Sequence, residues 1–249
     1  MWQLDTTAFS AEVLWRAKVA ISKRANRDPG SPGITFELLA PLVNAAFDEK
    51  EVALATLYIL SYWYLLRVPS EGLPACLGSV GVESRQRAGK QLVLEGDKAT
   101  WYFDRRKNRE FPTRAGRPHT CAGGAKLCPV CTLESFIDVQ GLAVGDALFP
   151  GISAKQFNCQ LRKHLAASGA PSAETFTSKG FRRGHAQDIS RRYGVSPELK
   201  ASGGWTSISG ALCYASREEL EDLFVTKEVR RKKKQRQASS ESSSSSSDD

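Results

Sequence analysis

The fold is decided by residues 51–71, which read EVALATLYILSYWYLLRVPSE. Between Glu51 and Arg67 the chain has 15 consecutive uncharged residues, most of them apolar or aromatic. A membrane-spanning helix needs roughly 20 apolar residues, so this stretch is too short to cross a bilayer. We therefore predict a helix that is buried in a protein core and that ends at Pro69.

The sequence before this helix predicts two more helices joined by a linker. Residues 10–25 carry apolar side chains at helical spacing, and the segment 28–33, DPGSPG, interrupts that pattern. Thr35 can then cap a second helix that continues through Leu42.

Beyond Pro69 the pattern changes to short apolar or β-branched runs, separated by glycine and charged residues. These runs lie at residues 76–82, 91–94 and 100–103. They predict a small antiparallel sheet of three strands.

The helical pattern returns from Leu133 onwards. Helices are predicted at residues 156–167 and 181–193, after an N-cap at Ser196, and after a capping box that begins at Ser216. The order is helices, sheet, helices, which predicts a mainly α protein with a small three-stranded antiparallel sheet, an α+β fold.

The charge of the chain favours an anionic partner. Its 249 residues include 35 Lys and Arg against 27 Asp and Glu, a net charge of +8, and 41% are hydrophobic, enough for a full core. The segment 227–237 carries a net +6 and the segment 238–249 a net −3, so residues 1–226 retain +5. The body of the protein is therefore basic without its tail.

The first residues lack the basic start and apolar run of a secretory signal, so we expect an intracellular protein that does not associate with membranes. The basic run 227–236 has two interpretations: a nuclear targeting signal or nucleic-acid contact, or a solvated, disordered end. The serine run 242–247 cannot form a core and is expected to be disordered.

Four separated segments carry residues suited to phosphate chemistry. They are LLRVPSE at 65–71, RRKNR at 105–109, KGFRRGHA at 179–186, and GGWTS at 203–207 leading to Tyr214. In this order and at these intervals they resemble the tyrosine recombinases, or integrase family, over residues 35–225. The Gly-Gly-Trp-Thr motif is most similar to that of the Cre recombinases.

The resemblance implies a DNA strand-cleaving and rejoining enzyme that acts in recombination or integration. In this family a Tyr oxygen attacks a phosphodiester and forms a 3′-phosphotyrosyl link, which conserves the bond energy, so no cofactor is required for catalysis. Tyr214 matches the nucleophile, nine residues after Trp205. The partner would be double-stranded DNA, bound by a homo-tetramer.

The remaining roles follow the same resemblance and the needs of the reaction. Arg67 and Arg182 would hold the phosphate oxygens, because guanidinium groups bind them bidentately and stay charged. Lys107, with Lys98 as its nearest rival, would protonate the leaving 5′-oxygen. Trp205 would donate its indole N–H to an oxygen.

Lys179 departs from the family pattern, which usually has His three residues before the second Arg. A Lys can still contact the phosphate, but it leaves the general-base role open. His185 lies three residues after Arg182 and is either a second candidate or a structural residue. For Arg106 and Arg183 we expect solvated side chains or contacts with the DNA backbone.

A second motif consists of His119, Cys121, Cys128 and Cys131. Three thiols and an imidazole suit a structural zinc ion, and Cys-x-x-Cys is a common half of such a site, although His-x-Cys is unusually tight. Structural zinc and unliganded thiols both remain possible, and we expect no catalytic role for zinc.

The resemblance divides the chain into three parts. Residues 1–34 would be an N-terminal helix and linker, the remnant of a core-binding domain. Residues 35–226 would be the catalytic domain, and 227–249 the basic and then serine-rich tail. Alternatives are an inactive DNA-binding relic, a type IB topoisomerase-like enzyme, and a zinc-stapled interaction protein in which Tyr214 is fortuitous.

Overall fold

The structure is a computed structural model that describes residues 31–82, 89–104, 106, 112–121, 127–193 and 203–205. The helices expected at 10–25, after Ser196 and after Ser216, and the tail 227–249, lie outside the described residues.

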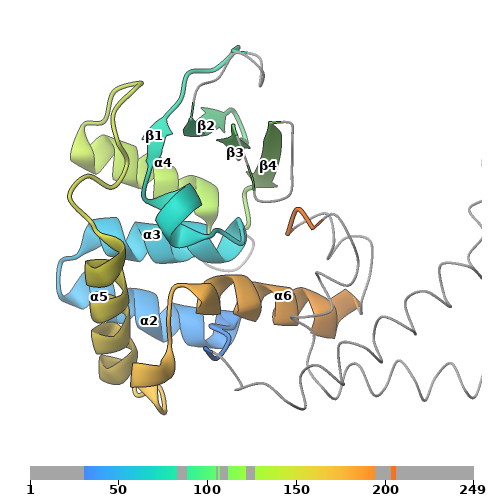
Figure 1. Cartoon of the computed structure of the whole chain (residues 1–249). Coiled ribbons are helices and arrows are strands. Elements are labelled where there is room, and N and C mark those ends of the chain that lie inside the picture. The colour runs from blue at the N-terminus through green and yellow to red at the C-terminus, as the bar shows by residue number, and fades with distance from the viewer. Residues whose placement is uncertain are drawn as a thin grey trace, which may run out of the picture.

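In the described residues, a small sheet lies at one side of a group of helices (Figure 1). The α-helices are α2 (Phe36–Asp48), α3 (Val52–Trp63), α4 (Pro129–Gln140), α5 (Ala154–Ala167) and α6 (Lys179–Tyr193). Two short turns are the π-helical η1 (Val68–Gly72) and the 3-10 helical η4 (Ala173–Thr175). The strands are β1 (Ala75–Leu77), β2 (Lys90–Glu95), β3 (Lys98–Phe103) and β4 (Thr113–Pro118). The predicted fold class, mainly α with a small sheet, is confirmed.

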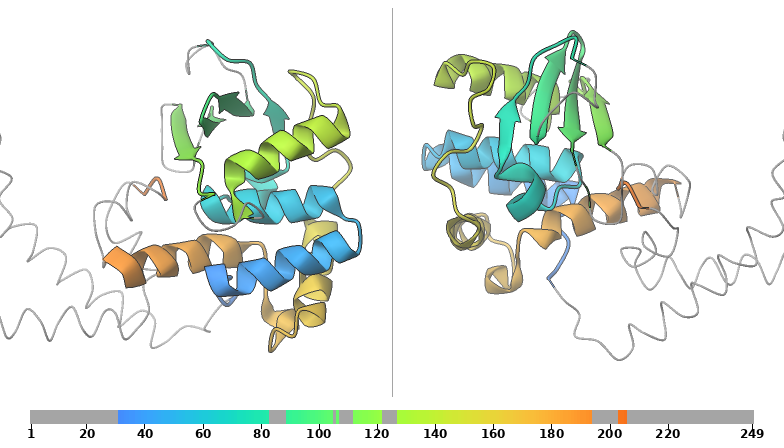
Figure 2. Two further views of the ribbon diagram at one scale, coloured as in Figure 1. Left: turned by 180° about the vertical axis from the view of Figure 1, so that it is seen from behind. Right: turned by 45° about the horizontal axis from the view of Figure 1, so that its top comes forward.

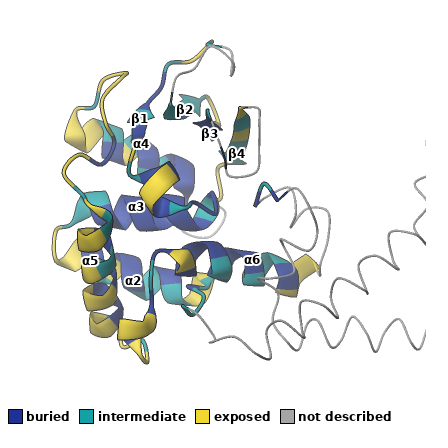
Figure 3. Cartoon of the chain, viewed as in Figure 1, coloured by how far each residue is buried: buried dark blue, intermediate teal, exposed yellow. Residues whose placement is uncertain are grey.

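Helix α3 is the centre of the core. It lies between α4 on one side and α2 and α6 on the other, in both views of Figure 2. Every residue from Leu54 to Tyr62 is buried, and Figure 3 shows α3 dark blue along most of its length. A helix that is apolar on all sides is stable only when it is covered on all sides. In the described part of the chain, no helix has the length and hydrophobicity to span a membrane.

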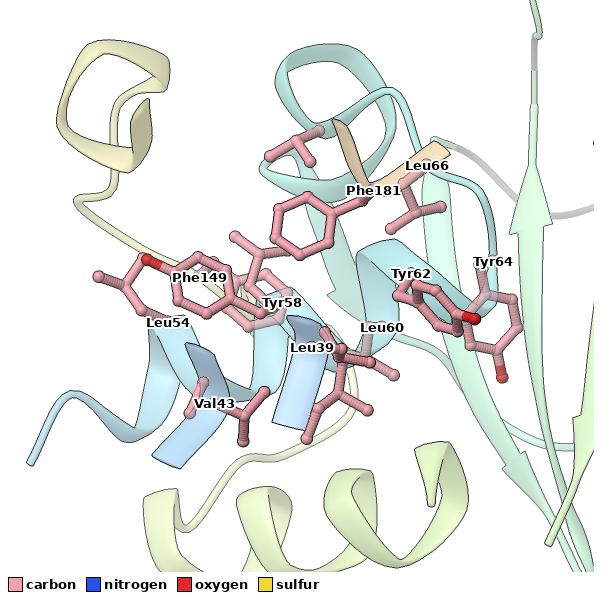
Figure 4. Packing of buried hydrophobic residues seen from close by; sticks show 14 of the residues in the cluster. Leu39, Val43, Leu54, Tyr58, Leu60, Tyr62, Tyr64, Leu66, Phe149 and Phe181 are labelled. Atoms are coloured by element: carbon pink, nitrogen blue, oxygen red, sulfur yellow. The ribbon is translucent and has the colours of Figure 1, made fainter. Parts of the chain in front are cut away.

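The tyrosines of this region bury their rings and direct their hydroxyls to specific partners. Tyr58 stacks on Phe181 in the core, with ring centroids 5.5 Å apart (Figure 4). Its hydroxyl lies 3.0 Å from Nδ1 of His164. The hydroxyl of Tyr64 donates to the carbonyl of Ala99 at 2.6 Å. Because a buried hydroxyl without a partner is costly, these bonds fix how α3 sits against α5 and β3.

The sheet has four strands in the order β1-β2-β3-β4, not three (Figure 2, right). The pairs β2–β3 and β3–β4 are antiparallel as expected, but β1 runs parallel to β2. The missed strand, β4, reads TRAGRP, and its burial alternates along the strand. Polar edge strands of this kind lack the apolar run by which a strand is recognised.

Helix α3 ends at Trp63, six residues before Pro69. Leu65 adopts the left-handed conformation, with φ of 49°, and this turns the chain out of the helix. Pro69 instead lies in the first turn of η1, where its missing N–H costs no hydrogen bond. The prediction that Pro69 ends the buried helix was therefore wrong.

The segment 31–35 packs along α6. The N–H of Ile34 donates to the carbonyl of Gly180 at 2.9 Å, and Arg183 donates to the carbonyl of Ser31. A Cβ at Gly184 would overlap the carbonyl of Ile34, so this close approach requires glycine. Arg183 is thus bound to a carbonyl of the protein rather than fully solvated.

Candidate active site

Arg67 lies between the end of α3 and η1. Its Nη1 donates to Oε1 of Glu71 at 2.9 Å, and its backbone N–H donates to Oε2 of the same carboxylate at 2.9 Å. The π-helical turn produces this geometry, because it places Glu71 back over the residue that caps the turn. The Arg67 side chain remains 34% exposed and can be reached from solvent.

Arg106 binds the same carboxylate from the other side. Its Nη2 lies 3.2 Å from Oε2 of Glu71, and its Nε lies 3.2 Å from Oε1. The guanidinium also lies 3.8 Å above the ring of Phe103. Arg106 is only 5% exposed, so the expectation of a solvated side chain was wrong. The buried carboxylate explains the burial of this cation, since an unpaired charge could not enter the core.

Arg182 connects α6 to two other segments. Its Nη1 donates to the carbonyl of Leu65 and its Nη2 to the carbonyl of Gly203, both at 2.7 Å. Its guanidinium lies 4.6 Å from the ring centroid of Trp205. Leu65 is thus part of the site, because Arg182 binds its backbone carbonyl. The same residue has the left-handed backbone conformation described above.

The turn at residues 203–205 brings the two arginine clusters together. Gly204 has φ of 62°, and a Cβ on it would lie only 2.6 Å from Nη1 of Arg106. Trp205 is 9% exposed and packs against Leu65 and Ala186. Arg106 and Arg182 therefore meet on either side of one short turn, and Glu71 connects Arg106 to Arg67.

Of the remaining predicted catalytic residues, two lie outside the described part of the chain and one, Lys179, is described. Lys107 and Tyr214 lie outside the described residues. Lys179 is the first residue of α6 and is exposed, whereas Arg182, one turn later, is buried. The predicted residues that the structure brings together are Arg67, Arg182 and Trp205.

His185 occupies an aromatic cluster rather than the arginine cluster. Its ring centroid lies 4.4 Å from that of Tyr62 and 5.5 Å from that of Trp63. Burial, together with the nearby charge of Arg117, lowers the pKa of His185 from 6.5 to about 3. A neutral, enclosed imidazole of this kind is structural. Of the two interpretations of His185, a candidate general base or a structural residue, the structure favours the second.

The four predicted metal ligands also come together. Nδ1 of His119 lies 3.4 Å from Sγ of Cys121, 3.7 Å from that of Cys128 and 3.4 Å from that of Cys131. Burial opposes ionisation of Cys128, but hydrogen bonds from Cys131 and Thr120 lower its pKa to about 6. This cluster is separate from the arginines and is considered below.

Comparison with solved structures gives a match to the XerH site-specific recombinase, determined bound to difH substrate in a pre-cleavage complex. The TM-score is 0.53 and the sequence identity is 12%. The chain has the fold of a tyrosine recombinase catalytic domain. The match covers 79% of this chain and 55% of XerH, so the chain spans little more than half the length of that recombinase. No family model and no curated protein match the sequence.

Sequence reasoning missed two members of the site, Glu71 and Arg106. Both lie in segments singled out by their motifs, but Glu71 was given no role, and Arg106 was expected to be solvated or to contact the DNA backbone. The available signal was the carboxylate four residues after Arg67, which needs a cationic partner if it is buried. Nothing in the sequence places Arg106, 35 residues away, beside it.

Proposed function

We propose that this chain binds double-stranded DNA and cleaves and rejoins one strand through a 3′-phosphotyrosyl link to Tyr214, in DNA recombination or integration. The observation that supports this most is the convergence of Arg67, Arg106 and Arg182 from three distant segments, on the fold of a recombinase catalytic domain.

The charge at this point suits a phosphate. Arg67 and Arg106 share one carboxylate, Glu71, whereas Arg182 binds only backbone carbonyls, so these four side chains together carry a net charge of +2. A phosphodiester carries one negative charge, and its pentacoordinate transition state carries more. Fixed cations stabilise the second state more than the first, which is the requirement for catalysis. Arg67 is the most exposed of the three and is the one that we expect to contact DNA first.

The covalent step uses residues of the chain alone. The hydroxyl of Tyr214 gives up its proton to water as its oxygen forms a bond to phosphorus and the bond to the 5′-oxygen breaks. The leaving 5′-oxygen takes a proton from Lys107. Lys179 is exposed on the first turn of α6 and contacts a phosphate oxygen, with no acid–base role. Trp205 packs against the cluster and limits the access of water. The reverse attack by a 5′-hydroxyl restores the strand, and homo-tetramers bring two sites together for exchange.

The test is capture of the covalent adduct. The full chain is incubated with a pool of nicked, radiolabelled duplexes of randomised sequence, denatured in detergent and examined for label on the protein. We expect label with the wild type and none with Tyr214→Phe. Label on both proteins, or on neither, overturns the proposal.

Two further measurements identify the alternatives if no adduct forms or no exchange follows. Salt-sensitive duplex binding without an adduct identifies the DNA-binding relic, because phosphate contacts survive the loss of chemistry. Relaxation of supercoiled plasmid without exchange between sites identifies the topoisomerase-like activity. Absence of duplex binding identifies the interaction protein.

A further inference from the structure

We propose that His119, Cys121, Cys128 and Cys131 bind one structural zinc ion, which fastens the end of β4 to the start of α4. The ligand atoms of these four residues all lie within 4.8 Å of one another. His119 and Cys121 precede residues 122–126, which lie outside the described part, and Cys128 and Cys131 follow them.

The spacing of the ligand atoms matches a tetrahedral ion. Zinc–sulfur bonds of about 2.3 Å and zinc–nitrogen bonds of about 2.0 Å place such atoms roughly 3.5 to 3.8 Å apart. The three distances from His119 are 3.4, 3.7 and 3.4 Å. Cys121 and Cys131 are closer, with 3.0 Å between their Sγ atoms, and would separate by less than 1 Å.

The donor set indicates a structural site. Three thiolates and one imidazole complete the coordination of zinc and leave no position for water or substrate. Backbone N–H groups around the site support it, since Thr120 donates to Sγ of Cys128 at 3.3 Å. Such hydrogen bonds orient a ligand and stabilise its charge.

The local structure already positions the ligands. Cys128 is the N-cap residue of α4 and Cys131 lies in its first turn. His119 directly follows β4, and its backbone N–H donates to the carbonyl of Asp97 in the turn between β2 and β3. The ion would therefore join the helix to the edge strand of the sheet, which has no further strand beside it in the described residues.

Both sides of the cluster also contact Trp63, the last residue of α3. Arg117, two residues before His119, donates to the carbonyl of Trp63 at 2.9 Å. The indole of Trp63 donates to the carbonyl of Leu127, next to Cys128, at 2.7 Å. Zinc would thus stabilise the end of the helix from which the chain continues to Arg67. The metal proposal itself does not depend on DNA cleavage.

The other group of possible ligands in the described residues has a different character. Glu49, Glu51 and His164 lie close together, but Lys163 already binds Glu49 at 2.5 Å. The ammonium of Lys163 competes with a cation for Glu49, and the group lacks the thiolates that are typical of structural zinc sites. This group supplies a matched control, because Glu49→Gln removes a possible ligand at a different place.

The experiment measures zinc by mass spectrometry in full-length protein purified with zinc and reductant and then dialysed. We expect one zinc per chain in the wild type, in Glu49→Gln and in Cys159→Ser, whose thiol is free and exposed. His119→Ala should lose most of the metal, and His119→Cys should retain it, because a fourth thiolate can replace the imidazole. His119 is exposed, so both variants are expected to fold.

A second experiment measures the melting temperature with and without a chelator. Chelation should lower the melting temperature of the wild type, and added Zn²⁺, but not Mg²⁺, should restore it. The proposal is overturned if the wild type retains no zinc, if His119→Ala retains as much as the wild type, or if Cys121 and Cys131 form a disulfide in the reduced preparation.

Discussion

Glu71 and Arg106 form a buried ion pair across 35 positions of sequence, with Oε1 of the first 3.2 Å from Nε of the second. Both side chains are at most 5% exposed, so neither charge can be hydrated when the other is absent. The pair joins η1 to the segment after β3. Because Arg67 binds the same carboxylate, the position of the exposed cation depends on the buried one.

Replacement of Glu71 should therefore be strongly destabilising. In Glu71→Gln two guanidinium groups lose their counter-charge, and removal of one partner from a buried pair costs about 3–5 kcal/mol. Chemical denaturation measures the free energy of unfolding. The control is Arg191→Gln, which breaks an exposed pair with Asp188 and should change stability little. Equal effects of the two changes would contradict the role given to Glu71.

Gly204→Ala should displace Arg106. The added Cβ would lie 2.6 Å from Nη1, and the residue would keep a left-handed φ of 62°. Gly141→Ala is the matched control, since Gly141 has the same φ but nothing within 4 Å of an added Cβ. The control should cost about 1–2 kcal/mol from the backbone alone. Gly204→Ala should cost more and also reduce adduct formation, whereas equal losses would show that Arg106 can move aside.

Arg67 should be needed for the chemistry more than for folding. Removal of one group that stabilises transition-state charge typically reduces the rate about 10²- to 10³-fold, and we expect this for adduct formation by Arg67→Ala. Arg67→Lys should recover only part of the rate, because an ammonium cannot bind two oxygens in one plane. Single-turnover assays on nicked duplex measure the effect. Arg162→Ala on α5 is the control, and a similar loss there would argue against a specific role.

Stability should fall as the pH is lowered below 6.5. The unfolded imidazole of His185 takes up a proton near pH 6.5, but burial holds the folded pKa at about 3, so protons favour the unfolded state between these values. The slope approaches 1.4 kcal/mol per pH unit. Denaturation between pH 7.5 and 5 measures it. In His185→Phe, which keeps an aromatic ring beside Tyr62, the slope should largely disappear, and an unchanged slope would refute the assignment to His185.

Most of the helices could be predicted from the sequence because their signals are local. The apolar run identifies α3, and the spacing in α5 and α6 identifies these two helices within a few residues of their ends. The strand β4 and the end of α3 could not be predicted. The first is a polar edge strand, and the second depends on a left-handed Leu65 whose carbonyl binds Arg182.

In the candidate site, too, residues with a local sequence signal could be predicted, and residues that depend on distant contacts could not. Arg67, Arg182 and Trp205 were predicted from motif spacing, and the structure brings them to one place. Arg106 was expected to be solvated or to contact the DNA backbone, and its burial depends on a carboxylate far along the chain. The four metal ligands lie within 12 residues of one another, so their clustering could be predicted while their occupancy could not.

The strip formed by residues 31–35 has a practical consequence for protein engineering. A truncated version that starts at Phe36, where the first described helix starts, would lose the backbone that covers Gly180 and Gly184. Two glycines on the helix that carries Arg182 would then face water, and the carbonyl of Gly180 would lose the N–H of Ile34 that donates to it. Shortened versions for crystallisation should keep Ser31, even though it lies outside every helix and strand.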